Sequence, residues 1–436
     1  MDNKRIYVIG GGTFNYVRAH LALATPAFGS TARKIAELCQ ANEKLDTELV
    51  LTKMAVNDSS QQDRNIITNE DLREECLRIK ADPLAKIIFF SAGVMDFDGR
   101  VGEEAGKYAP RLDSSLGEVM LLDPAEKIID LFRAGKDGRK DLFLVGFKTT
   151  CGVSPEKQYL AGLNLLKRSS CNLVLANDIV TRRNMVICPE EACYHETTDR
   201  DEALQGLVEM VMLRSHLTFT RSTVVDGSPV PWDSEDVFPV LRTVVNYCIE
   251  RGAYKKFRGV TAGHFAQKLS DTEFLTSIRK TDFNDMPQVG LVRVRTDGPD
   301  SVIAYGAKPS VGGQSQRIVF HEHQGYDCIV HFHCPIKPGS NVPVVSQREY
   351  ECGSHQCGKN TSTGLKQFGN LSAVYLDQHG PNIVFHHSID PEEVIRFIED
   401  NFDLEQKTGG YQLPAQKSSE GEREYGKATW EPLKTS

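Results

Sequence analysis

Residues 5–13 read RIYVIGGGT, an apolar run that leads directly into three glycines. Such a run is typical of a buried strand, and glycines at its end let the backbone approach a phosphate. Helix-period segments such as Thr31–Cys39 and Ala203–Leu213 separate it from later apolar runs. Strands are expected at Arg5–Ile9, Leu49–Thr52, Lys86–Ser91, Leu142–Gly146, Asn172–Ala176 and Met185–Cys188. This alternation predicts an α/β fold with a doubly wound, mostly parallel, Rossmann-like sheet.

The pattern changes near residue 218, where Pro229 and Pro231 interrupt a polar segment. We interpret residues 218–236 as a linker between an N-terminal domain, 1–217, and a second domain, 237–405. The polar residues 406–436 are expected to form a disordered or loosely docked tail. In the second domain, helices are expected at Val240–Arg251 and after Asp390, and strands at Phe274–Ser277, Gly290–Arg295, Ser301–Gly306, Cys328–His333, Leu371–Asp377 and Asn382–His386.

Composition excludes several classes of function. The net charge is −8 and no basic stripe is present, so we expect no binding to nucleic acid. No apolar run reaches the roughly 18 residues of a membrane span, and the N-terminus lacks the pattern of a signal peptide. The 11 cysteines are scattered and odd in number, as expected of reduced thiols. We therefore expect a cytoplasmic protein.

Two histidines end an apolar run in the C-terminal half. Residues 328–335 read CIVHFHCP, and period-two geometry places His331 and His333 on one face of a strand. A third, His379, follows the next long apolar run and precedes a glycine. Three histidines with an open fourth position describe a catalytic zinc site. The alternative is two chance strand histidines and a turn histidine.

Further motifs accompany these histidines. Residues 262–265 read AGHF, and residues 274–277 read FLTS. Together with the histidines they resemble the class II aldolase/adducin family over residues 237–405. The resemblance implies an α/β/α fold, a divalent ion, usually Zn²⁺, that polarises a carbonyl, and a homo-oligomer, either dimer or tetramer. It also implies a phosphorylated small-molecule substrate, with Gly263, His264, Ser277 and Ser310 as the substrate- or phosphate-binding residues.

This sequence departs from that family at its acid/base. Family members carry a glutamate in a Pro-Ser-x-Glu stretch, whereas Lys308–Arg317 holds no carboxylate. Glu322 is the nearest substitute as a catalytic residue, and the alternative is a solvated helix residue. Arg279 and Lys280 add positive charge near the expected phosphate. A second metal group could form from Cys352, His355 and Cys357.

Polar or small residues also end several N-terminal strands, where ligands bind in open α/β sheets. The succession resembles the phosphopantothenoylcysteine synthetase family over about residues 4–215. The resemblance implies a nucleotide such as CTP and the nucleotide-binding residues Gly11, Gly12, Thr13, Arg18, Asp96, Phe147, Lys167 and Asn177.

The catalytic elements of that family are altered. Ala22 stands where the family has an asparagine, and Asp113 stands at a flap lysine. A carboxylate repels a triphosphate. We therefore predict a metal-dependent lyase fused to a nucleotide-binding domain. The alternatives are a bifunctional protein with genuine phosphopantothenate–cysteine ligase activity and a non-catalytic regulatory protein of the adducin type.

Overall fold

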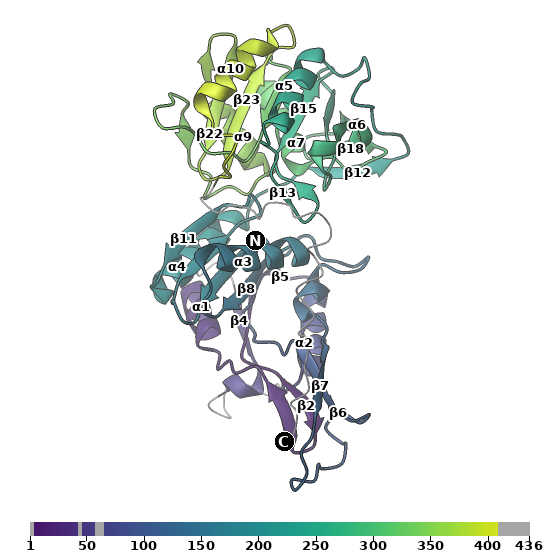
Figure 1. Cartoon of the computed structure of the whole chain (residues 1–436), viewed down its shortest axis with the longest axis vertical. Helices are drawn as coiled ribbons and strands as arrows, with labels where there is room; N and C mark the ends of the chain where they lie inside the picture. Colours follow the sequence, from purple (N-terminus) through teal and green to yellow (C-terminus); the bar gives the residue numbers. More distant parts are fainter. Residues whose placement is uncertain (1–3, 42–45, 57–64, 409–436) are drawn as a thin grey trace, which may run out of the picture.

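The computed structural model describes residues 4–41, 46–56 and 65–408. Figure 1 shows two α/β parts stacked along the long axis of the molecule. Each part is built on its own large sheet, as the sequence predicts. Within the described ranges, every helix is too short or too polar to cross a membrane.

The N-terminal part is a seven-stranded sheet in the order β11-β10-β9-β8-β5-β1-β4. Strands β4, β1, β5, β8 and β9 are parallel, and β10 and β11 add an antiparallel edge. Helices α1 and α4 cover one face, and α2 and α3 cover the other. The predicted doubly wound fold is confirmed. The bounds are β1 Arg5–Gly10, α1 Ser30–Gln40, β4 Asp46–Leu51, α2 Asn69–Ala81, β5 Ala85–Phe90, β8 Phe143–Thr150, α3 Pro155–Ser169, β9 Leu173–Asp178, β10 Asn184–Ile187, β11 Cys193–Thr197 and α4 Arg200–Arg214.

Two hairpins extend from this part, at the lower end of Figure 1. They pair β2 (Phe14–Arg18) with β3 (Leu21–Ala24), and β6 (Phe97–Val101) with β7 (Met120–Pro124). The sequence did not predict these strands. Every residue of β7 is exposed. The strand therefore has no buried face, and an alternation of apolar and polar residues could not indicate it in the sequence.

The C-terminal part is a ten-stranded, mainly antiparallel sheet in the order β12-β18-β17-β16-β15-β19-β23-β22-β20, with β21 paired to β22. Helices α5 and α10 pack in the large core on one face, and α8 contributes to a smaller core on the other. The expected α/β/α layering is confirmed. The main bounds are β12 Arg221–Val225, α5 Pro239–Glu250, β15 His264–Lys268, β16 Glu273–Ser277, β17 Leu291–Thr296, β18 Ser301–Tyr305, α7 Val311–Ser315, α8 Arg317–Glu322, β19 Cys328–His331, β20 Val344–Val345, α9 His355–Gly364, β21 Lys366–Phe368, β22 Leu371–Leu376, β23 Gly380–Phe385 and α10 Pro391–Asn401.

Two expected boundaries differ from the structure. Segment 218–236, interpreted as a linker, contains β12, which pairs with β18, and Trp232, which is buried in the main core. The prolines and polar residues of this segment favoured a loop in the sequence analysis, although the segment contains an edge strand of the second sheet. At the start of the expected tail, Lys407 and Thr408 are both buried. Residues 409–436 lie outside the described residues.

Candidate metal centre

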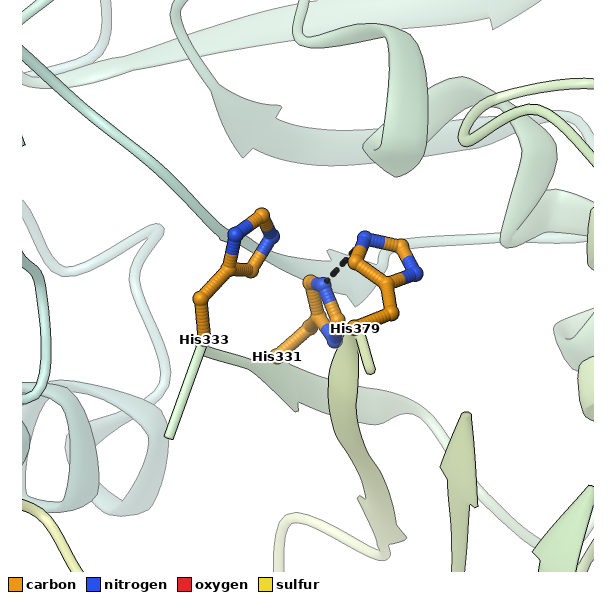
Figure 2. Close-up of side chains that lie close together, drawn as sticks. All are labelled: His331, His333 and His379. Atoms are coloured by element: carbon orange, nitrogen blue, oxygen red, sulfur yellow. Dashed lines mark hydrogen bonds between the residues drawn. The ribbon is translucent and has the colours of Figure 1, made fainter. Parts of the chain in front are cut away.

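Three histidines converge at one edge of the second sheet. His331 ends β19, His333 follows two residues later, and His379 lies in the turn between β22 and β23. One ring nitrogen from each lies within 4.8 Å of the others. Figure 2 shows the three rings turned toward a common centre, with the Nε2 atoms of His331 and His379 3.2 Å apart. The structure therefore brings the predicted ligands together.

The protonation of these rings suits metal ligands. Burial lowers the pKa of His331 to about 4 and holds the pKa values of His333 and His379 well below their usual range. Nδ1 of His331 lies 2.7 Å from the carbonyl oxygen of Pro381 and donates to it, which leaves the Nε2 lone pair free. The Nδ1 atoms of His333 and His379 are buried without a hydrogen-bond partner. Neutral imidazoles with unsatisfied nitrogens fit a divalent ion.

Glycines on both sides allow this approach. A Cβ atom on Gly263 would lie 2.6 Å from the carbonyl oxygen of His331, and one on Gly380 would lie 2.1 Å from that of Phe332. Both glycines also have positive φ angles, 109° and 141°. No other residue could occupy these positions without displacing the backbone that carries the histidines.

A fourth imidazole, His264, adjoins the group. His264 in β15 pairs directly with His331 in β19, and the two rings are stacked with centroids 4.8 Å apart. Its Nδ1 atom is buried without a partner. The predicted substrate-binding residues Ser277 and Ser310 also meet, because the amide of Ser310 donates to the carbonyl of Ser277 at 2.9 Å.

Glu322, the expected catalytic residue, contacts α9 instead of the histidines. It ends α8, and its carboxylate accepts hydrogen bonds from Lys359 at 2.7 Å and from Ser362. The helix precedes the start of β19, whereas His331 stands at the end of that strand. The carboxylate of Glu322 therefore contacts α9, near the end of β19 that is opposite to His331.

The second expected metal group does not form either. His355 Nε2 contacts Thr220, and the thiol of Cys357 contacts Gln347. Asp327, His386 and His387 do lie close together, at the opposite end of β19 from His331. There the amide of Ser388 donates to Nδ1 of His386, and Nδ1 of His387 contacts the carboxylate of Asp327.

Several of the predicted nucleotide-binding residues meet at the carboxyl edge of the first sheet. Gly11, Gly12 and Thr13 follow β1, and the amide of Gly93 donates to the carbonyl of Gly11. Asp96 follows β5 and pairs with Lys127. Phe147 lies in β8 and pairs with Leu175, whereas Asn177 lies two residues further along β9 and pairs with Thr149.

Arg18 and Lys167 lie apart from that edge. The guanidinium of Arg18 is buried and donates to the carbonyls of Val17, Val101 and Glu104. Lys167 lies in the last turn of α3, which places it at the opposite, amino edge of the sheet. The structure therefore does not bring these two predicted nucleotide-binding residues together with the others.

Lys167 instead belongs to a buried ionic group between the two parts, which sequence reasoning missed. Glu191 forms ion pairs with both Lys167 and Lys407, each with an N–O distance of 3.2 Å, and Lys407 donates to the hydroxyl of Tyr159 at 2.6 Å. The amide of Thr408 donates to the carbonyl of His333 at 3.2 Å. The start of the expected polar tail, Lys407 and Thr408, thus contacts both the first domain and the backbone of His333, a candidate metal ligand. No sequence signal marked Lys407.

Comparison with known proteins gives a partial match. No family model matches the chain. The chain is 27% identical over 179 residues to the coenzyme A biosynthesis bifunctional protein CoaBC of Thermococcus kodakarensis. The matched residues cover 41% of this chain and 42% of that protein. The chain therefore spans less than half of the length of this curated relative.

Solved structures match each part separately. The DNA/pantothenate metabolism flavoprotein from Streptococcus pneumoniae is 19% identical, with a TM-score of 0.39, and covers 48% of this chain and 98% of that one. The L-fuculose-1-phosphate aldolase from Thermus thermophilus is 18% identical, with a TM-score of 0.28, and covers 37% of this chain and 85% of that one. The N-terminal half thus matches CoaBC-type synthetases, and the rest matches class II aldolase-like folds.

Proposed function

We propose that the C-terminal part is a metal-dependent enzyme of the lyase or aldolase type, acting on a phosphorylated or nucleotide-linked small molecule. The observation that carries this proposal is the convergence of three buried imidazoles, two of which have a ring nitrogen without a hydrogen-bond partner. Three protein ligands leave a position for substrate, as in catalytic zinc sites. A divalent ion held there would act as a Lewis acid toward a carbonyl oxygen.

The residues of the chain itself supply orientation. The Pro381 carbonyl fixes the tautomer of His331, so its Nε2 lone pair points toward the centre. His264 stacks on His331, and its unpartnered Nδ1 can accept or donate a hydrogen bond. With Glu322 bound to α9, we assign no acid/base to that carboxylate.

Elemental analysis tests this proposal. We expect purified protein to hold one divalent ion per chain and the His331→Ala/His333→Ala double variant to hold none. The His323→Ala variant is the matched control, because His323 contacts Ser362 on α9 instead of the triad. Equal metal content in the double variant and the wild type would refute the assignment. Metal binding without turnover of any phosphorylated carbonyl compound would favour a regulatory protein instead.

For the N-terminal part we propose nucleotide binding at the carboxyl edge of the first sheet. A genuine phosphopantothenate–cysteine ligase is the second candidate, because the curated relative is a coenzyme A biosynthesis protein. Local chemistry opposes it. Ala22 offers a methyl group where an amide is expected, and Asp113 lies in an exposed turn, where it accepts hydrogen bonds from Ser115.

Pyrophosphate release from CTP with phosphopantothenate and cysteine separates these two candidates. Loss of a charge-complementing donor costs about 10²–10³ in rate, so two such losses should leave negligible turnover. Turnover near one per second would establish the ligase, since it lies within the usual range of about 1–10³ per second for enzymes.

A further inference from the structure

Two of the three candidate ligands lie in loops, whereas the third belongs to a paired strand. His331 is held by strand pairing on both sides, with His264 in β15 and Asn382 in β23. His333 follows the end of β19, and His379 lies in the turn between β22 and β23. Loops are held less firmly than paired strands. The positions of these two histidines relative to His331 therefore depend on what contacts their loops.

The turn that carries His379 is contacted by the first part of the chain. The hydroxyl of Tyr194, in β11, donates to the carbonyl oxygen of Asp377 at 3.3 Å. Tyr194 is 7% exposed and packs in the core of the first part. Gln378, between Asp377 and His379, has a φ of 54°, which is costly for a residue with a side chain. A strained turn persists only where neighbouring groups hold it, and Tyr194 is such a neighbour.

The backbone of His333 is contacted by a segment that the first part holds. The amide of Thr408 donates to the carbonyl oxygen of His333 at 3.2 Å. The preceding residue, Lys407, is buried, forms an ion pair with Glu191 and donates to the hydroxyl of Tyr159. That hydroxyl in turn donates to the carbonyl of Glu191 at 2.7 Å. The first part therefore fixes the segment that contacts His333.

Both contacts start from one short segment of the first part, residues 190–194. This segment is also fastened to the second part, because Glu190 forms a fully buried ion pair with Arg214. The guanidinium of Arg214 donates to the backbone carbonyl of Arg348, in the second part, at 2.9 Å. Loss of one partner from a buried ion pair is strongly destabilising, so this junction resists separation of the two parts.

We propose that residues 190–194 of the first part position His333 and His379, so that a centre of full metal affinity forms only while the two parts are docked. The inference rests on the proposed function, for which it assigns positioning residues. These residues act through the backbone of the ligand loops and do not contact the metal. Groups that orient metal ligands in this way are commonly worth about 10- to 100-fold in metal affinity.

Substitutions in the full chain test the two contacts separately. Tyr194→Phe removes the hydroxyl that contacts Asp377, and Thr408→Pro removes the amide that contacts His333. We expect each to lower the affinity for Zn²⁺, measured by competition with a chelator, by about tenfold or more. Tyr326→Phe is the control for the first variant, because its hydroxyl contacts a serine near the start of β22, away from the histidines. Thr408→Ala, which keeps the amide, is the control for the second.

A third variant tests the dependence of His333 on the first part. Glu191→Gln removes the charge that holds Lys407 and changes no residue of the second part. We expect it to lower the affinity for Zn²⁺ about tenfold, as Thr408→Pro does. Glu202→Gln is the matched control, because Glu202 contacts Thr197 within the first part.

The visible absorption spectrum of Co²⁺-loaded protein distinguishes positioning from a loss of stability. A shift of the ligands changes the ligand field of Co²⁺, whereas a variant that is only less stable gives the wild-type spectrum in its folded fraction. We expect altered spectra for Tyr194→Phe, Thr408→Pro and Glu191→Gln, and wild-type spectra for the three controls. Urea midpoints of the same proteins report their stability independently.

The outcomes separate this inference from the proposed function. Wild-type protein that binds Zn²⁺, with all three variants binding as tightly as their controls, would overturn the inference and leave the proposed function standing. Weaker binding with unaltered Co²⁺ spectra would overturn it as well. An unchanged Tyr194→Phe variant alone would refute the positioning of His379, and an unchanged Glu191→Gln variant alone would refute the positioning of His333 by the first part. Wild-type protein that binds no Zn²⁺ would refute the proposed function, and the inference with it.

Discussion

Gly380 and Phe332 approach so closely that a Cβ atom on Gly380 would lie 2.1 Å from the carbonyl oxygen of Phe332. Phe332 stands between His331 and His333, and Gly380 directly follows His379. The contact therefore sets the distance between the two loops that carry the histidines.

We predict that Gly380→Ala destabilises the protein by on the order of 2 kcal/mol, because the added carbon must displace backbone and the φ of 141° disfavours a side chain. Metal affinity should fall in parallel. Gly325→Ala is the matched control, because a Cβ there meets nothing within 4 Å. Urea unfolding and metal titration check both effects, and an unchanged Gly380→Ala variant would contradict the packing described.

Nucleotide binding is expected to depend on Asp96 and Phe147 at the carboxyl edge of the first sheet. Titration with cytidine and adenosine nucleotides should give binding that weakens about tenfold or more in Asp96→Asn or Phe147→Ala, because each removes a polar or stacking contact worth about 1–3 kcal/mol. Asp123→Asn, which alters a carboxylate paired with Arg100 on the hairpin, is the control. No binding of any nucleotide at millimolar concentration would mean that only the fold has been retained.

Glu351 should make stability depend on pH. Burial raises the pKa of Glu351 to about 7, although Arg214 and the amide of Asn172 act in the other direction. The folded state thus holds a proton that the unfolded state loses near pH 4.5. Stability is highest below that pH and falls as pH rises toward about 7, by roughly 2–3 kcal/mol.

Replacing Glu351 with glutamine removes this titration. We expect Glu351→Gln to flatten the profile between pH 5 and 8 and to be more stable than the wild type at pH 8. Glu349→Gln, in the same segment, should keep the wild-type profile, since Glu349 accepts from Ser346 instead. Urea midpoints at several pH values provide the measurement, and parallel wild-type and Glu351→Gln profiles would exclude this assignment.

The pair Lys407–Glu191 offers a test of the junction. Lys407→Met should destabilise by about 3–5 kcal/mol, because it removes one partner of a buried ion pair and leaves its carboxylate with less compensation. Adding Glu191→Gln should recover part of this loss, since the uncompensated charge is then gone. A double-mutant cycle of unfolding free energies measures the coupling. Additive effects would show that the two side chains do not interact.

Local pattern was sufficient to predict much of the fold and the metal group. Apolar runs predicted the core strands, since each is buried in the structure, and period-two spacing placed His331 and His333 together. The position of Glu322 could not be predicted, because sequence proximity to β19 does not specify which end of the strand a helix adjoins. His264, predicted through family resemblance, pairs directly with His331.

Contacts between the parts could not be predicted in the same way. Asn172 of the first part donates to Glu351 of the second, and nothing in the sequence around either residue indicates the other. Lys407 follows the last helix in a segment whose composition resembles a solvated tail, yet it is buried by Glu191 and Tyr159. Such contacts depend on how two sheets pack, a non-local property that hydrophobic period does not encode.

The contacts of Lys407 and Thr408 also have a consequence for a gene that encodes the two parts separately. Glu191 is encoded in the first part and Lys407 at the end of the second, so a gene divided near residue 217 would separate the partners of a buried ion pair. The carbonyl of His333 would lose its contact with Thr408 only if the terminal segment were also lost. Fission of such a gene would therefore place the two partners of the ion pair on separate chains, which would have to associate again to restore it.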